Sequence, residues 1–129
     1  FLFKQIKPIL DIRLQEVYGL EVALYSSYLR VAGRVDLVGM WDGKVSIIDF
    51  KTSSKRKKRD WISNYFMQES AYAVMFEEMF KIPVSQLVTI IAVESDEPQV
   101  FIEKRDDWID GFVKLRDQYE SQTKTGAYA

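Results

Sequence analysis

Two aspartates and a lysine of this chain lie in or beside short apolar runs, where charged side chains are uncommon. Asp36 lies within the run Val35–Val38, and Asp49 lies within the run Ile47–Phe50. Lys51 directly follows the second run, two residues after Asp49. Runs rich in β-branched and apolar residues are typical of buried strands. A buried carboxylate is costly unless it is protonated or paired. Two acids in such segments therefore indicate a bound cation.

A tight turn is expected between the two runs. The pair Asp42–Gly43 favours a two-residue hairpin turn with positive backbone torsions. With the turn centred on this pair, Asp36 faces Asp49 across the two strands. Residues two apart on a strand share a face, so Lys51 lies beside Asp49 and Phe50 points away. We therefore predict that both acids and the lysine project from one face of an antiparallel hairpin.

Paired carboxylates beside a lysine suit one kind of chemistry. Mg²⁺ and Mn²⁺ are hard cations that take oxygen ligands and leave positions open for water and phosphate. The Lys51 amine beside such a metal can orient or deprotonate water and offset charge on a phosphate in the transition state. The pattern favours metal-dependent hydrolysis. The alternative is an ordinary surface network of Asp and Lys on a hairpin, and the apolar flanks argue against it.

Composition limits the other possibilities. The chain has 129 residues, of which 47% are hydrophobic and 14% aromatic, enough for one domain with its own core. No run of about 18 apolar residues occurs, so we expect no membrane span. Cysteine and histidine are absent, which excludes disulfides, thiolate metal sites and histidine bases. Only carboxylates remain as metal ligands.

Positive charge is concentrated directly after the second aspartate. Residues 51–59 hold six of the 18 basic residues and no acid, although the net charge is −1. Basic side chains that contact phosphates give strongly salt-dependent binding. The predicted nucleic-acid contacts are Lys55, Arg56, Lys57, Lys58 and Arg59. Next along the chain, Trp61 and Tyr65 could stack on unpaired bases, or they could be ordinary core aromatics.

Hydrophobic periodicity and turn residues predict the remaining elements. We expect a helix over residues 1–17 that Pro8 interrupts, strands over 20–27, around Asp36 and around Asp49, a helix over 61–80 with Asp60 as its N-cap, strands over 87–93 and 99–103, a helix over 106–119, and a frayed tail from Ser121. This order predicts an α/β fold with a mixed central sheet of about five strands, which begins as a three-stranded antiparallel meander and is flanked by helices.

The helix expected over residues 61–80 carries polar side chains in an apolar stripe. Gln68 and Tyr72 follow Trp61 and Tyr65 at steps of three or four residues. A buried glutamine needs hydrogen-bond partners, which the end of the Asp49 strand, a bound phosphate or a base could supply. The alternative is that Gln68 bonds to the backbone at a helix boundary. Further apolar residues on the other side of this helix predict packing against more than one sheet.

These elements and motifs together resemble the PD-(D/E)XK nuclease superfamily. The shared features are an Asp in the second strand, Asp-x-Lys in the third and Gln-x-x-x-Tyr in the next helix. Within the superfamily, the motifs Gly33-x-x-Asp36, Ile48–Ser53 and Gln68–Tyr72 look like the RecB-like branch, above all the mitochondrial genome maintenance exonuclease group and its phage relatives. The similarity extends from about Leu20 to Phe80.

The resemblance implies a restriction-endonuclease-like core and a role for each matching residue. Asp36 and Asp49 would hold Mg²⁺ or Mn²⁺, and the backbone carbonyl of Phe50 would complete the set. Lys51 would act on the attacking water. Glu21 falls where relatives often place an acid and is a further candidate ligand.

The resemblance also implies a role for the helical motif and one further metal ligand that this chain lacks. Gln68 and Tyr72 would support the site and touch nucleic acid. Relatives of this kind supply a metal-ligating histidine from an upstream helix, and this chain has none. Either that helix precedes Phe1, which we favour, or Glu16 or Glu21 substitutes for the histidine. We therefore expect residues 1–129 to be a single nuclease core domain that lacks an upstream helical segment and is inactive alone.

The substrate implied by the resemblance is DNA, single-stranded and processed from an end, in replication, repair or recombination. We expect the protein in the cytoplasm of a bacterial or phage-infected cell, not in a mitochondrion. A second hypothesis is a catalytically inactive nucleic-acid-binding module of the same fold, although such a module has no need of two buried acids. A third is a structural subunit of a recombination complex, which would show an exposed apolar patch in place of the basic run.

Overall fold

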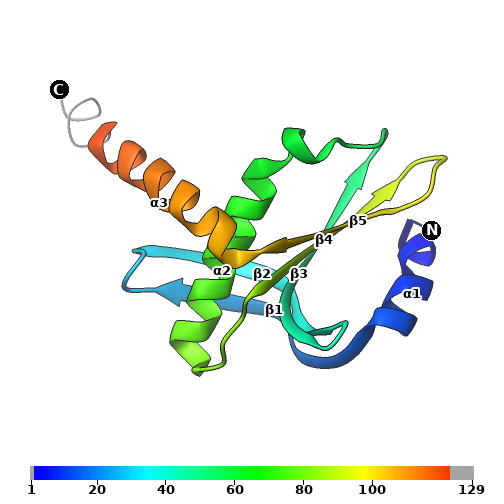
Figure 1. The fold of residues 1–129 in the computed structure, drawn as a ribbon, viewed down its shortest axis with the longest axis horizontal. Helices are drawn as coiled ribbons and strands as arrows, with labels where there is room; N and C mark the ends of the chain where they lie inside the picture. Colours follow the sequence, from blue (N-terminus) through cyan, green and yellow to red (C-terminus); the bar gives the residue numbers. More distant parts are fainter. Residues whose placement is uncertain (1, 123–129) are drawn as a thin grey trace.

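The computed structural model describes residues 2–122 of the chain. Its elements follow the predicted order (Figure 1): α1 (Leu2–Arg13), β1 (Leu14–Ser26), β2 (Val31–Trp41), β3 (Lys44–Ser53), a short 3₁₀ turn η1 (Arg59–Trp61), α2 (Ser63–Phe80), β4 (Gln86–Val93), β5 (Gln99–Lys104) and α3 (Arg105–Gln122). Of the tail predicted from Ser121, the first two residues belong to α3 and the rest lie outside the described residues. None of the described helices is long and apolar enough to cross a membrane.

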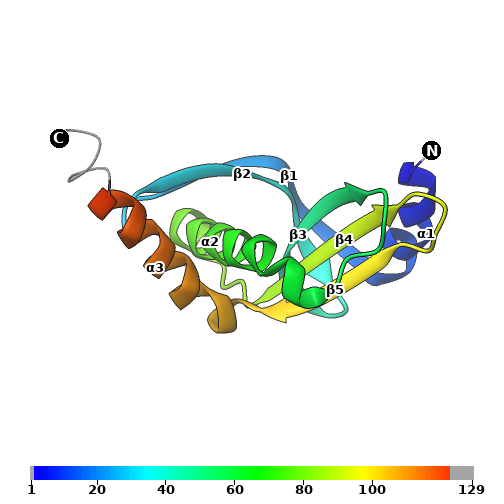
Figure 2. The ribbon, with the colours of Figure 1, turned by 90° about the horizontal axis from the view of Figure 1, so that it is seen from above.

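One five-stranded sheet forms the centre of the fold, with strand order β1-β2-β3-β4-β5. Among the described strands only β3 and β4 pair in parallel, as expected for strands that a crossover helix, here α2, connects. Helices α2 and α3 lie on one face of the sheet (Figure 2), and α1 packs on the other face. The predicted mixed sheet of five strands flanked by helices is confirmed.

The predicted hairpin between β2 and β3 is also confirmed. Both turn residues have positive φ, 49° at Asp42 and 82° at Gly43, which is the geometry that an Asp-Gly pair adopts easily. Cα pairing then runs from Trp41 opposite Lys44 to Leu37 opposite Ile48. The next residues in this register are Asp36 and Asp49.

Alternation along the strands decides which residues face which helix. On β2, β3 and β4 the residues Val38, Ile47 and Leu87 lie in the core beneath α2. Their neighbours, among them Leu37 and Ile48, lie in the core beneath α1. By the same period of two, the two aspartates fall on the α2 face.

Several predicted boundaries were wrong for physical reasons. Strand β1 begins at Leu14 instead of residue 20, because two irregularities in its pairing, before Glu16 and before Gly19, break the alternation that marks a strand. Pro8 lies inside α1 and does not end it. Asp60 is not the N-cap of α2, since it lies in η1 and Ile62 precedes the helix.

Within residues 2–122, the second apolar side of α2 is covered by α3 and β5, not by a further sheet. The ring centroid of Phe66 lies 5.1 Å from that of Trp108 and 6.1 Å from that of Phe101. The expectation that α2 packs against more than one sheet was therefore wrong. Helix α2 is instead enclosed between one sheet and α3.

Candidate active site

Asp36, Asp49 and Lys51 come together where the ladder between β2 and β3 ends. Backbone pairing between β2 and β3 ends at Leu37 and Ile48. Beyond this pair, the Asp36 Oδ2 accepts a hydrogen bond of 2.9 Å from the backbone N–H of Phe50. Asp49 is only 6% exposed. Its Oδ2 lies 3.2 Å from the Lys51 Nζ. The predicted juxtaposition of two acids and one lysine is present.

The electrostatics of this cluster favour a cation. Burial and the neighbouring Asp36 carboxyl raise the pKa of Asp49 to about 6, and Lys51 offsets the rise only in part. Burial lowers the pKa of Lys51, but the combined effect of Asp49, Tyr65 and Glu69 outweighs it, so the net pKa is raised and the ammonium stays charged. The Lys51 ammonium pairs with Asp49, and the Asp36 carboxyl lies beside this pair. A bound cation would relieve the excess negative charge.

The residues present fit a hard divalent cation that keeps part of its water shell. Among the described residues no group of three or more His, Cys, Asp or Glu side chains is gathered closely enough to hold a metal. Mg²⁺ is often bound by only one or two carboxylates together with water and substrate phosphates. The oxygen donors of Asp36 and Asp49 match that mode of binding.

Of the two glutamates considered as substitute ligands, only Glu21 lies near the cluster. Glu21 has a positive φ of 47° and lies on β1 between Leu20 and Val22, whose partners on β2, Leu37 and Val35, flank Asp36, so Glu21 is opposite Asp36. It also lines a surface hollow together with Asp36 and Phe50. Glu16 is opposite Met40, farther along β2. The substitution by Glu16 is therefore not supported.

Tyr72 of α2 packs closely on β2 next to the acids. A Cβ atom at Gly33 would lie 2.7 Å from the Tyr72 Cε1, so this glycine is what lets the ring approach the strand. Burial and the nearby Asp49 raise the pKa of Tyr72, which keeps the phenol protonated. Gly33 and Tyr72, both part of the motifs recognised in the sequence, are thus in direct contact.

The sequence predicted Gln68 on the buried side of α2, and this prediction was wrong. Its side chain is exposed, and Trp61 on the same stripe is 62% exposed. The helix instead turns Phe66, Glu69 and Ala73 toward the core. The reason is that the sheet covers one side of α2 and α3 covers a second side. Gln68 directly precedes the buried Glu69 in the sequence, but its own side chain faces solvent.

Glu69 and Thr89 are site neighbours that the sequence analysis missed. Glu69 is 0% exposed, and its two carboxyl oxygens lie 2.8 and 2.6 Å from the Thr89 Oγ1. Thr89 is the register partner of Asp49 on the adjacent strand. Burial raises the pKa of Glu69 to about 8, although the Thr89 bond opposes the rise. A glutamate at helical spacing between Phe66 and Ala73 was the signal that could have revealed it.

The two aromatic residues expected to stack on bases have different surroundings. The Tyr65 ring centroid lies 4.8 Å from the Lys51 Nζ, so this ring already holds the lysine. Trp61 is exposed, with the Lys58 Nζ 5.2 Å from its ring centroid. Of the two rings, Trp61 is the more exposed to solvent.

Comparison with known proteins agrees with this arrangement. A family model described as "PD-(D/E)XK nuclease superfamily" matches residues 5–124. No curated protein is significantly similar to the chain. Among solved structures, the chain is similar to the crystal structure of a protein from Eubacterium rectale named "Putative exonuclease", with a TM-score of 0.59 and 13% identity. The match covers 93% of this chain and 52% of that protein, so this chain spans about half its length. The shared fold confirms the predicted restriction-endonuclease-like core.

Proposed function

We propose, since this chain belongs to the PD-(D/E)XK nuclease superfamily, that it forms the core of a metal-dependent deoxyribonuclease that hydrolyses phosphodiester bonds. One observation carries the proposal. Asp36 and Asp49 meet at the open end of a strand ladder with Lys51 at 3.2 Å from the second acid. This arrangement offers oxygen ligands, a cation for the phosphate and access from solvent.

The metal ligands we propose are the two carboxylates and the Phe50 carbonyl. In an extended strand the N–H and C=O of one residue point toward the same edge. Because the Phe50 N–H points to Asp36, its carbonyl is on the same side. Glu21 is a further candidate from β1. Mg²⁺ or Mn²⁺ bound here would polarise the phosphate and lower the pKa of a bound water.

The proposed role of Lys51 is to orient the attacking water and to stabilise the negative charge that develops on the phosphate. Asp49 and the Tyr65 ring hold its amine in place. Tyr72 supports the site from α2 by packing on Gly33. Gln68, exposed on the same helix, is proposed to contact the nucleic acid.

The proposed substrate is single-stranded DNA, degraded from an end in replication, repair or recombination. The basic segment beyond β3 and the exposed Trp61 support this choice, since they provide charge for phosphates and a surface for unpaired bases. The name of the similar Eubacterium rectale protein is the support for exonuclease activity. We place the chain in the RecB-like branch, beside the mitochondrial genome maintenance exonucleases and their phage relatives, and in the cytoplasm of a bacterial or phage-infected cell.

The experiment that tests this proposal compares substrates with and without ends. The full-length protein is incubated in Mg²⁺ or Mn²⁺ with end-labelled linear single-stranded DNA, duplex DNA, RNA and circular single-stranded DNA. We expect release of short labelled products from linear single-stranded DNA and no cleavage of the circle. Cleavage of the circle would replace the exonuclease by an endonuclease, and no cleavage of any substrate would favour the inactive binding module.

A further inference from the structure

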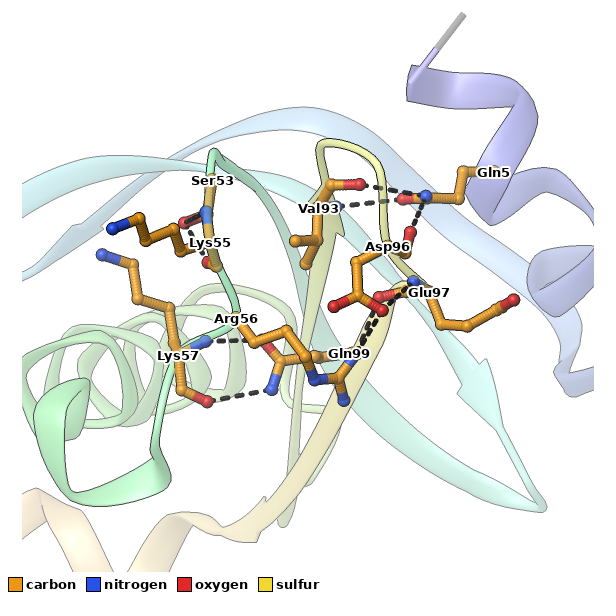
Figure 3. A network of polar contacts seen from close by, with 9 residues as sticks. All are labelled: Gln5, Ser53, Lys55, Arg56, Lys57, Val93, Asp96, Glu97 and Gln99. Atoms are coloured by element: carbon orange, nitrogen blue, oxygen red, sulfur yellow. Dashed lines mark hydrogen bonds and ion pairs between the residues drawn. The ribbon is translucent and has the colours of Figure 1, made fainter.

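The basic segment Lys55–Arg59 follows a defined path even though it carries five positive charges in a row. Such a run repels itself and is usually disordered. Here Gln99 of β5 holds the middle of it (Figure 3). The backbone N–H of Lys57 donates to the Gln99 Oε1 at 2.8 Å, and the Gln99 Nε2 donates to the Lys57 carbonyl at 2.9 Å. The Gln99 side-chain amide thus makes both hydrogen bonds to the Lys57 backbone that the backbone of a neighbouring strand would make.

The two arginines of the segment are occupied by the protein itself. The Arg56 guanidinium donates to the Glu97 carbonyl at 3.0 Å and lies 3.6 Å from the Asp96 carboxylate. Arg59 donates two bonds, of 2.7 and 2.6 Å, to the carboxylate of Glu103, which is 9% exposed. A two-pronged pair of this kind with a buried acid is held firmly. These arginines tie the segment to β5 and to the turn between β4 and β5.

The turn that receives Arg56 is itself anchored from the opposite face of the sheet. Gln5 of α1 accepts a bond from the Val93 N–H at 3.0 Å and donates to the Val93 carbonyl at 3.1 Å. Its amide also donates to the Asp96 carbonyl. Figure 3 shows these contacts as one network from α1 to the basic segment. The turn that holds Arg56 of the basic segment is therefore itself held in place by α1.

The three lysines of the segment have no acidic partner in the part of the chain that the structure describes. Within residues 2–122 no carboxylate lies within ion-pair distance of Lys55, Lys57 or Lys58. In Figure 3 the side chains of Lys55 and Lys57 point away from the turn between β4 and β5, whereas Arg56 points toward it. Lys58 lies over the exposed Trp61 ring. Among the described residues, the lysine charges thus have no carboxylate partner that competes with a ligand, whereas both arginine charges are paired with carboxylates.

We propose that Gln99 is a substrate-positioning residue, which holds Lys55, Lys57 and Lys58 in place to bind the phosphates of single-stranded DNA while Arg56 and Arg59 only secure the segment. This inference rests on the proposed function and adds a division of labour within the basic run. A loop already ordered before binding avoids the entropy that a mobile run would lose on the DNA. Lysine ammonium groups then serve as point charges for phosphates.

The test measures the affinity of the full-length protein for a fluorescent single-stranded oligonucleotide at several salt concentrations, in chelator so that no strand is cleaved. We expect Lys57→Ala to reduce the slope of log Kd against log salt by about 0.7. Arg56→Ala should keep the parent slope. Gln99→Ala should also keep the slope, because every lysine remains, but should raise Kd about tenfold and speed amide exchange at Lys57.

The matched control is Gln15→Ala, which removes another glutamine bond to the backbone, from the Gly43 N–H at 2.6 Å, on the β2–β3 turn. It should bind like the parent. The inference is overturned if Arg56→Ala reduces the slope as much as Lys57→Ala, or if Gln99→Ala leaves either Kd or Lys57 amide exchange unchanged. If the unaltered protein binds no single-stranded DNA, the proposed function itself fails, and this inference with it.

Discussion

The backbone N–H of Phe50 donates a hydrogen bond of 2.9 Å to the carboxylate of Asp36, so a side chain takes the place of a strand neighbour at the end of the β2–β3 ladder. This contact brings the acid on β2 to the strand that carries the other two site residues. It also separates the structural role of the Asp36 side chain from its charge, because an amide oxygen can accept the same bond.

In the full-length protein, Asp36→Asn should therefore strongly reduce cleavage while leaving the fold intact. The asparagine oxygen can still accept from Phe50, but the negative charge for a metal is lost. We expect the rate of DNA cleavage to fall by about 10²–10³-fold, with an unfolding midpoint close to that of the parent. Asp110→Asn, an exposed change on α3, is the control and should retain the parent rate. A cleavage rate near the parent value would remove Asp36 from the metal site.

Lys51→Ala should slow the chemical step more than it weakens DNA binding. The Lys51 ammonium is held by Asp49 and the Tyr65 ring beside the proposed metal ligands. Its loss should lower kcat by about 10²-fold or more, with Kd for DNA changed only a few-fold. Lys44→Ala, an exposed lysine at the hairpin turn, should change neither. An effect of Lys51→Ala on Kd alone would make this lysine a phosphate contact instead of a catalytic residue.

Glu69 should make the metal-free protein less stable as pH rises. The folded pKa of about 8 lies above the ordinary value of 4.5, so the folded state holds the proton more tightly than the unfolded state. The corresponding stability is present below about pH 4.5 and is lost as pH rises through about 8. Urea unfolding from about pH 6.5 to about 8.5 should show this decline, and Glu69→Gln should flatten it. The same slope in Glu69→Gln would show that Glu69 does not titrate there.

Gly33→Ala should destabilise the contact between β2 and α2. The new Cβ would lie 2.7 Å from the Tyr72 Cε1, and overpacking of this kind costs roughly 1–3 kcal/mol. Chemical denaturation should report the loss. The double variant Gly33→Ala, Tyr72→Leu, in which the ring is absent, should lose less than the sum of the two single changes. Strict additivity would show that the ring is not the obstacle.

Local signals in the sequence were sufficient for the hairpin and for the acids it brings together. The Asp42–Gly43 pair determines the turn, the turn determines the register, and the register places Asp36 opposite Asp49. Each step depends on neighbouring residues alone, which is why it could be predicted. The apolar run around Asp49 correctly indicated a strand, β3, and the uninterrupted apolar run over residues 87–93 identified β4 to within one residue.

The parts that could not be predicted depend on contacts between distant residues. Which side of α2 is buried depends on α3 and the sheet together, so Gln68 was placed inside and Glu69 was overlooked. The bonds between Gln99 and Lys57 join residues 42 positions apart and follow no local pattern. The irregular pairing of β1 hides its first residues from any test of periodicity.

The central claim is that Asp36, Asp49 and Lys51 form a metal-dependent nuclease centre. The most direct measurement is the rate at which the full-length protein releases labelled nucleotides from linear single-stranded DNA as Mn²⁺ or Mg²⁺ is titrated, for the parent and for Asp49→Asn. The account predicts no release in chelator, a saturable rise with metal for the parent, and almost none for Asp49→Asn. Release that persists in chelator, or proceeds at the parent rate in Asp49→Asn, would contradict it.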